Sequence, residues 1–268
     1  METELANSPD ILLQRAKLIH FEHPLSERYR FFLRLEYLFK LMDHNMRRDA
    51  PENSHNALSA MLDIVNVVGR TDIKTESVKE LERIAGVLAP LVGKPGIEHT
   101  RLHYILQYVK QTSAKLRELT GPIDKHIKED ELLKILQLRN NIPGGMCDFD
   151  LPAYRFWLTQ PSEQRIQDLE TWFKPYSYLR NAIEVALELI RTSESFENHT
   201  AEAGIYKQLL DTKTHYQLIV VSLPEQTKYY PEFSGSRHRF SIRFIDTTMK
   251  YPAQTADDVE FYLSCCKL

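Results

Sequence analysis

The spacing of apolar residues changes once along this chain, near Ser193, and this change constrains the fold more than any other feature. Between Ser26 and Arg191, apolar residues recur every three or four positions, as on one face of an α-helix. After Ser193 the spacing becomes two, and β-branched and aromatic residues become frequent, as in strands with one buried face. A run of helices followed by a run of strands predicts an α+β fold. We therefore expect a mainly helical domain over residues 1–195, with residues 1–20 extended or disordered, and a small antiparallel β domain over residues 196–268.

Individual helices and strands can be predicted within these two regions. Ser26 is a good N-cap for the first helix, because a serine side chain can accept a hydrogen bond from a free N–H group of the first turn. Further helices are expected over residues 54–68, 71–91, 98–119, 124–138, 152–158, 162–173 and 176–192. Strands are expected over residues 204–210, 215–223, 237–245 and 259–264, with a weaker one over 229–233.

The predicted strand over residues 237–245 is basic, and no acidic residue occurs between Glu232 and Asp246. In a strand, alternate side chains point to opposite faces. The outward set would be Arg237, Arg239, Ser241 and Arg243, and the inward set Phe240, Ile242 and Phe244. At about 3.3 Å per residue, the first and last arginines lie roughly 20 Å apart, which suits an extended anionic partner. The alternative is an ordinary solvated sheet face.

The composition limits the class of protein. No stretch approaches 18 consecutive apolar residues and acidic residues precede the first apolar run, so we expect neither a membrane span nor a secretory signal. Three cysteines, two of them adjacent, are poorly suited to disulfides and fit a cytoplasmic location. The net charge of −3 argues against a general nucleic-acid-binding protein. The basic strand is therefore a local feature.

Two pairs of residues have a spacing that could serve catalysis or metal binding. His99 and His103 lie one helical turn apart, as in a zinc pair, but the glutamate of a metalloprotease helix is absent between them. Asp148 and Asp150 share a face of an extended segment, as the paired carboxylates of a hydrolase do. The simpler interpretation is that an aspartate here caps the helix that begins near Pro152. We therefore expect no enzymatic activity, no cofactor and no metal site.

Four motifs together resemble one known family. They are FEHPLSER at 21–28 leading into LRLE at 33–36, IPGGMCDFDLP at 142–152 with Trp157, SGSRHRFSIRF at 234–244, and the terminal Cys265-Cys266. In this order and at these separations they are similar to the motifs of the ZapD family, bacterial cell-division proteins that associate with the FtsZ ring. The resemblance covers about residues 21–266.

The resemblance implies a helical domain with a β domain, a symmetric homodimer and no catalysis. It also implies that a basic pocket binds the C-terminal tail of FtsZ, so that a dimer can bridge and bundle filaments at the mid-cell division ring. Arg239 and Arg243 lie within the matching motif and are the first candidates for tail contacts. Arg70 and Lys128 correspond to other basic positions of the pocket. Arg237 and Arg30 are further basic candidates, and neither nucleic acid nor membrane is expected as a partner.

The chemistry of the basic strand agrees with such a partner. Charge-assisted hydrogen bonds between guanidinium groups and carboxylates are worth about 1.5–3 kcal/mol each, so two or three of them suggest micromolar affinity. A dimer that faces a polymer gains a further factor of about 10² to 10⁴ by avidity. The alternative is a nucleic-acid-binding module in which the same arginines contact phosphates and Tyr229, Tyr230 and Phe233 stack on bases.

Overall fold

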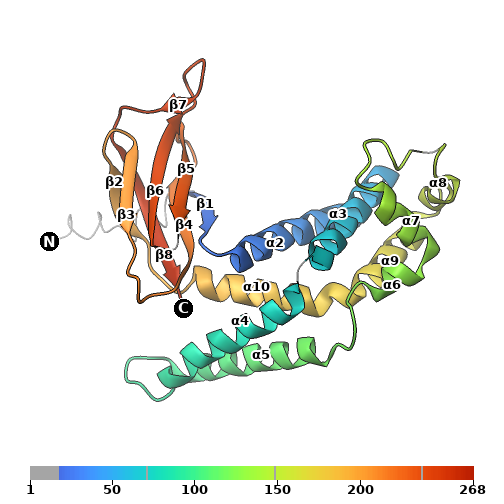
Figure 1. Ribbon diagram of the computed structural model, residues 1–268, viewed down its shortest axis with the longest axis horizontal. Coiled ribbons are helices and arrows are strands. Elements are labelled where there is room, and N and C mark those ends of the chain that lie inside the picture. The colour runs from blue at the N-terminus through green and yellow to red at the C-terminus, as the bar shows by residue number, and fades with distance from the viewer. Residues whose placement is uncertain (1–17, 71, 148, 237) are drawn as a thin grey trace, which may run out of the picture. The chain divides into compact units, whose positions relative to one another are not determined.

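The computed structural model describes residues 18–268 except 71, 148 and 237, and it contains both helices and antiparallel strands, as the α+β prediction requires (Figure 1). The helices are α2 (Glu27–Met46), α3 (Pro51–Arg70), α4 (Ile73–Leu88), α5 (His99–Glu118), α6 (Lys125–Glu129), α7 (Glu131–Arg139), α8 (Pro152–Leu158), α9 (Ser162–Phe173) and α10 (Ser177–Arg191), with the short 3-10 helices η2 (Ala89–Leu91) and η3 (Lys174–Tyr176). The strands are β1 (Leu18–Pro24), β2 (Glu197–Ala201), β3 (Ile205–Leu209), β4 (Tyr216–Pro224), β5 (Tyr229–Ser236), β6 (Arg239–Asp246), β7 (Ala253–Gln254) and β8 (Val259–Lys267).

The contacts divide the chain into a helical unit, Phe31–Leu187, and a β unit, which joins Glu188–Leu268 to the described residues up to Arg30. In this division the described residues up to Arg30 group with the C-terminal strands, because the N-terminal strand pairs with a distant part of the chain. β1 is antiparallel to β4, from Leu18 opposite Pro224 to Pro24 opposite Leu218. A pairing partner that far away along the chain leaves no local signal in the sequence.

In the helical unit, side chains that cap helices set several of the boundaries. Ser26 Oγ accepts a hydrogen bond from Tyr29 N (3.4 Å), which confirms the predicted N-cap of α2. The segment predicted as one helix over residues 124–138 is two helices, because Asp130 is extended and its side chain accepts a hydrogen bond from Leu133 N (2.9 Å) at the start of α7. Aspartate is favoured at such positions since its carboxylate satisfies a free N–H group of the first turn.

The helical unit is held together by buried apolar faces and by one buried arginine. The buried apolar residues that α2 contributes to this unit are Phe32, Leu35, Phe39 and Met42. Arg165 on α9 is 4% exposed, and it donates to Ser54 Oγ of α3 (2.9 Å) and to backbone carbonyls of Gln160 and Asp49. These bonds satisfy a guanidinium that would be costly to bury alone. None of the helices within the described residues has the length and apolar character of a membrane-spanning segment.

The β unit consists of two antiparallel sheets. Sheet A has the strand order β1-β4-β8-β2, and sheet B has the order β3-β6-β5 with β7 beside β6. Their inner faces share one apolar core, since alternate residues of each strand point inward. β4 contributes Ile219, Val221 and Leu223, β6 contributes Phe240, Ile242 and Phe244, and β8 contributes Val259, Phe261 and Leu263. The outer face of sheet B points away from this core and is available for contacts with other molecules.

Candidate functional site

Strand β6 has the alternation that its sequence predicts. Phe240, Ile242 and Phe244 are 3%, 0% and 0% exposed and lie in the shared core, whereas Arg239 and Arg243 are exposed. Arg237 lies outside the described residues. The core therefore fixes the register of the strand, and this register turns both described arginines outward, because a slip by one residue would exchange the two faces.

The neighbouring strands add a lysine and several small side chains to this outward face. The register places Leu209 of β3 and Ser236 of β5 on either side of Arg239. In the next outward row, Lys207 of β3 and Ser234 of β5 flank Ser241. We call the outward side chains of these rows and of the Arg243 row the cationic face; its members are Ile205, Lys207, Leu209, Glu232, Ser234, Ser236, Arg239, Ser241 and Arg243.

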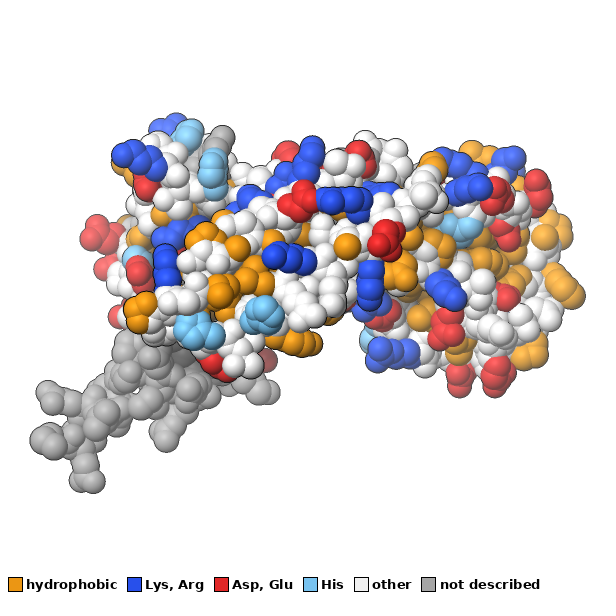
Figure 2. All heavy atoms as spheres, turned by 90° about the horizontal axis from the view of Figure 1, so that it is seen from below, with side chains coloured by type: hydrophobic (Ala, Val, Ile, Leu, Met, Phe, Trp, Pro, Cys, Tyr) orange, Lys and Arg blue, Asp and Glu red, His pale blue; other side chains and the backbone are white. Residues whose placement is uncertain are grey.

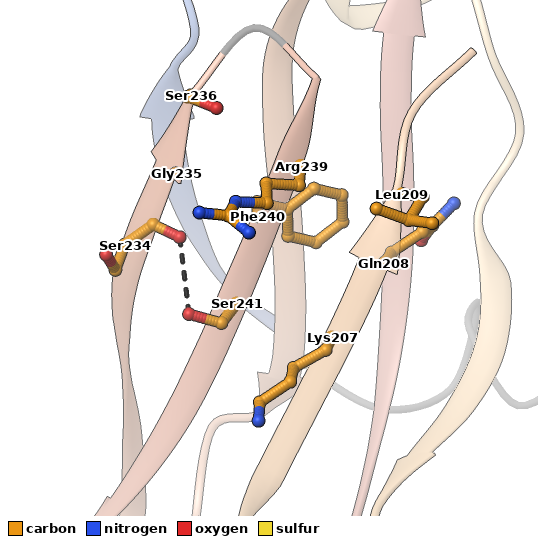
Figure 3. A pocket seen from close by; sticks show the side chains of 9 residues that line it. All are labelled: Lys207, Gln208, Leu209, Ser234, Gly235, Ser236, Arg239, Phe240 and Ser241. Carbon is orange, nitrogen blue, oxygen red and sulfur yellow. Dashed lines mark hydrogen bonds between the residues drawn. The ribbon is translucent and has the colours of Figure 1, made fainter.

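The cationic face contains a hollow of about 580 Å³. Lys207 and Arg239 lie on its border, and Ser234, Ser236 and Ser241 line it (Figure 3). The hollow exists because serines are too short to fill the space between two long basic side chains. Ser241 Oγ donates to Ser234 O (3.4 Å), so this hydroxyl is held down against the sheet. A ligand that enters the hollow can contact two cations, Lys207 and Arg239, and the hydroxyl groups of the serines between them.

The three cations of this face differ in their local partners. Within the described residues, neither Lys207 nor Arg239 has an acidic side chain within salt-bridge distance. Arg243 Nη2 lies 2.9 Å from Glu232 Oε2, and the two side chains are 57% and 45% exposed. Arg239 and Lys207 are therefore the more available cations, and Arg243 can contact a ligand only in competition with Glu232.

The other predicted basic residues do not line this hollow. Arg30 is near the start of α2, where its Nε lies 3.1 Å from Glu27 Oε1. Arg70 lies between the helices predicted over residues 54–68 and 71–91; in the structure it is the last residue of α3 and lines a separate hollow of about 340 Å³ in the helical unit. Lys128 on α6 lines a third hollow of about 280 Å³, and its Nζ lies 2.9 Å from Asp124 Oδ2. Arg239 and Arg243 thus share one face of the β unit, whereas Arg70 and Lys128 belong to the helical unit and Arg30 to the start of α2.

Sequence reasoning missed Lys207 and Leu209. Their alternation within the predicted strand over residues 204–210 gave a weak signal, since it put both side chains on the same face. The sequence does not state that β3 pairs with β6, and this pairing is what places Lys207 opposite Ser241.

The residues proposed for base stacking are largely engaged within the protein. Tyr229 Oη donates to Asp257 Oδ2 (2.8 Å), and the ring of Phe233 stacks on His23 at a centroid distance of 5.1 Å. Tyr230 is half-buried. Tyr229 and Phe233 are therefore held by contacts within the protein, and of the three aromatic residues only Tyr230 has no such contact among the described residues.

The residues weighed for catalysis and metal binding lie in the helical unit. His99 and His103 are exposed on α5, and within the described residues no group of three or more His, Cys, Asp or Glu side chains could hold a metal ion. Asp148 lies outside the described residues. The predicted aspartate cap of α8 is wrong: the N-cap is Leu151, and the Asp150 carboxylate accepts from Cys147 Sγ (3.5 Å). Arg139 Nη1 lies 3.7 Å from the same carboxylate, which draws it away from the helix.

Comparison with known proteins identifies the family. The family model "ZapD: Cell division protein" matches residues 33–243, a range that runs from α2 to Arg243 of the cationic face. The chain is 35% identical to a Coxiella burnetii protein named "Cell division protein ZapD" over 258 residues, which are 94% of this chain and 99% of the relative. The chain belongs to the ZapD family. A Chromobacterium violaceum ZapD protein is also 35% identical, over 252 residues that cover 93% of this chain and all of the relative. Membership of the ZapD family gives this protein a role in cell division, and the relatives span both of its units.

Proposed function

We propose that this protein binds the C-terminal tail of FtsZ on the cationic face and, as a homodimer, cross-links FtsZ filaments at the mid-cell division ring. The observation that carries the proposal is the hollow between Lys207 and Arg239, two cations without an acidic partner among the described residues. An acidic peptide would supply the missing carboxylates. The role is that of a binding protein without catalysis.

The physical chemistry of the hollow suits a weak and reversible contact. Guanidinium and ammonium groups on an exposed sheet bind carboxylates by charge-assisted hydrogen bonds, and solvent screens part of this attraction. A single tail is therefore expected to bind with micromolar affinity. Two tails held by one dimer multiply the apparent affinity by roughly 10² to 10⁴, which is how weak sites can bundle a polymer.

A homodimer requires a surface that can be covered by a second copy. Figure 2 shows hydrophobic side chains exposed among basic and acidic ones on the helical unit. Among the described residues of the helical unit, the most exposed large apolar side chains are Phe149 (83%), Leu138 (71%), Phe156 (69%) and Tyr104 (68%). Exposed apolar side chains that are scattered singly are ordinary on a folded protein, so a dimer surface requires several of these residues to form one contiguous patch.

The proposal is tested by removing one cation at a time. Arg239→Ala should weaken binding of a synthetic FtsZ tail peptide by roughly ten- to hundredfold, because one charge-assisted hydrogen bond is lost. Co-sedimentation with FtsZ filaments should fall in parallel. Arg243→Ala should have a smaller effect, since Arg243 is already paired with Glu232. The thermal melt should change little, because both side chains are exposed and the Arg243–Glu232 ion pair is worth at most about 1 kcal/mol.

Arg101→Ala is the matched control, since it removes an exposed arginine from α5 of the helical unit. It should bind the tail and bundle filaments as the wild type does. If the double variant Arg239→Ala, Arg243→Ala bundles filaments normally, the cationic face is not the tail site. Tight, salt-sensitive binding of a single-stranded oligonucleotide without any peptide binding would instead favour the nucleic-acid alternative.

A further inference from the structure

Strand β3 borders the hollow and is an end strand of sheet B. Backbone hydrogen bonds at its two ends fix its bonding pattern with β6. Phe244 N donates to Gly204 O (2.8 Å), and Leu210 N donates to His238 O (2.9 Å). In an antiparallel pair, hydrogen-bonded residue pairs alternate with pairs that are not hydrogen-bonded. The hydrogen bonds of Gly204 and Leu210 therefore show which residues between them direct their backbone N–H and C=O groups toward β6.

By this alternation, Tyr206 and Gln208 direct their backbone groups toward β6. The backbone N–H and C=O groups of Lys207 and Leu209 then point the opposite way, out of the edge of the sheet. No strand of sheet B lies beyond them among the described residues. An edge of this kind is a template for one more strand.

The other end strand, β5, is closed to a similar addition. Lys228 O accepts a hydrogen bond from Thr247 N (3.0 Å), so the same alternation turns the backbone groups of Pro231 and Phe233 outward. Proline has no N–H group to offer to a partner strand. The Phe233 ring is stacked on His23 of β1. Of the two end strands of sheet B, β3 is the one that can accept a partner.

We propose that the acidic tail peptide binds as an added strand along the free edge of β3. This inference rests on the proposed function, because it specifies how the same partner is held. The peptide backbone would pair with Lys207 and Leu209, and its carboxylates would lie on the side of Lys207 and Arg239. The charge of that side favours an acidic occupant, and the Leu209 side chain, 80% exposed, offers an apolar contact next to it.

The two sides of the added strand would have different charge preferences. Successive side chains of a strand point to opposite faces. One set would face Lys207 and the hollow. The other set would face the gap toward sheet A, where Gln208 lines a cavity of mixed charge together with Glu194, Glu197, His199 and Lys267. Acidic residues are therefore favoured at every second position of the peptide, on the side of Lys207 and Arg239, and gain no such preference at the positions between them, where the charges are mixed. A ligand held only by its charge would show no such alternation.

Hydrogen exchange of the full-length protein tests the inference directly. Saturation with a synthetic FtsZ tail peptide should slow amide exchange at Lys207 and Leu209, because their N–H groups become hydrogen-bonded. Exchange at Tyr206 and Gln208 should change less, since those amides are already bonded to β6. Backbone N-methylation at each peptide position in turn should weaken binding at alternate positions only.

A proline substitution tests the same point from the protein side. Leu209→Pro removes the outward N–H group without removing a bond to β6, and proline is tolerated on edge strands. Leu209→Ala is the matched control, because it removes the side chain and keeps the N–H group. The proline variant should bind the tail about three- to tenfold more weakly than the alanine variant, as expected for one backbone hydrogen bond. Thermal melts of both variants report whether the fold is retained.

The results separate this inference from the proposed function. If the peptide binds in an Arg239-dependent way while the Lys207 and Leu209 amides exchange as before, strand addition is overturned and the cationic face stands. Lys207 would then serve to prevent pairing between copies of the protein at a free edge. If the wild type does not bind the peptide at all, both proposals fail. If Leu209→Pro does not fold, strand addition is tested by hydrogen exchange of the wild-type protein and by the N-methylated peptides instead.

Discussion

At the scale of single residues, the ability of the cationic face to bind an acidic ligand depends on which of its cations already have acidic partners. Arg239 and Arg243 are equivalent in the sequence, since both are outward arginines of one strand. The structure distinguishes them, because β5 places Glu232 directly opposite Arg243. An exposed ion pair of this kind is worth about 0.2–1 kcal/mol. The carboxylate also repels any acidic ligand that approaches the face.

Glu232→Gln should therefore strengthen tail binding. The change frees Arg243 and removes a negative charge from the face, so we expect a gain of about two- to fivefold in affinity by fluorescence anisotropy at low salt. The gain should shrink at 0.5 M salt, because exposed charges are screened there. Glu260→Gln, on an exposed position of β8, is the control and should bind as the wild type does. Weaker binding by Glu232→Gln would show that Glu232 orients Arg243 for the ligand.

At the scale of elements, the position of β3 depends on the sharp turn that joins it to β2. Gly204 has φ = +71°, and a Cβ atom there would lie 2.6 Å from Thr255 O. The turn is also fixed by a hydrogen bond from Ala203 N to Asp258 Oδ1 (2.8 Å). Since β3 carries both Lys207 and the free edge, this turn aligns one side of the hollow with β6.

Gly204→Ala should destabilise the β unit for two reasons. An L-residue pays roughly 1 kcal/mol or more for a positive φ, and the new methyl group collides with a backbone oxygen that cannot move freely. We expect a total loss of about 2–4 kcal/mol in the free energy of unfolding, measured by urea denaturation. Gly96→Ala is the control: its φ is also positive (+85°), but no atom lies within 4 Å of the added Cβ. Equal losses in the two variants would mean that the contact with Thr255 is relieved at little cost.

At the scale of the whole molecule, stability is coupled to pH through a partly buried histidine in each unit. Burial lowers the pKa of His55 in the helical unit, where its Nδ1 lies 2.7 Å from Tyr154 Oη. Burial, and then the positive charge of Arg30, lowers the pKa of His23 in the β unit. Below a pH of about 6.5 the unfolded chain then binds more protons at these sites than the folded protein does.

Stability should therefore be complete above the unfolded histidine pKa and should fall as the pH decreases through the lower folded pKa values. Urea midpoints measured at pH 7.5 and pH 5.5 should show the decrease. His55→Gln should reduce this pH dependence, because it removes one of the two groups. His103→Gln, which changes an exposed histidine on α5, should leave it as in the wild type. A urea midpoint that is the same at both pH values would contradict the conclusion that His55 and His23 couple stability to pH.

The elements that could be predicted are those whose signal is local. The apolar spacing of the helices and the alternation in β6 each lie within one segment, and the structure confirms both. The strand β1 was not predicted, because its partner β4 is about two hundred positions away and only that pairing makes it a strand. Asp150 was predicted to cap α8, but contacts with Cys147 and Arg139 compete for its carboxylate.

The sequence by itself determined the fold class, the family and the outward direction of Arg239 and Arg243, because periodicity and motifs are written along the chain. Only the tertiary structure decided that Lys207 lies on the same face as those arginines, that Glu232 forms an ion pair with Arg243, and that β3 lies at the end of its sheet. These features depend on which strands become neighbours. Neighbouring strands are selected by burial of a shared apolar core across long stretches of sequence, and this selection leaves no mark on any single segment.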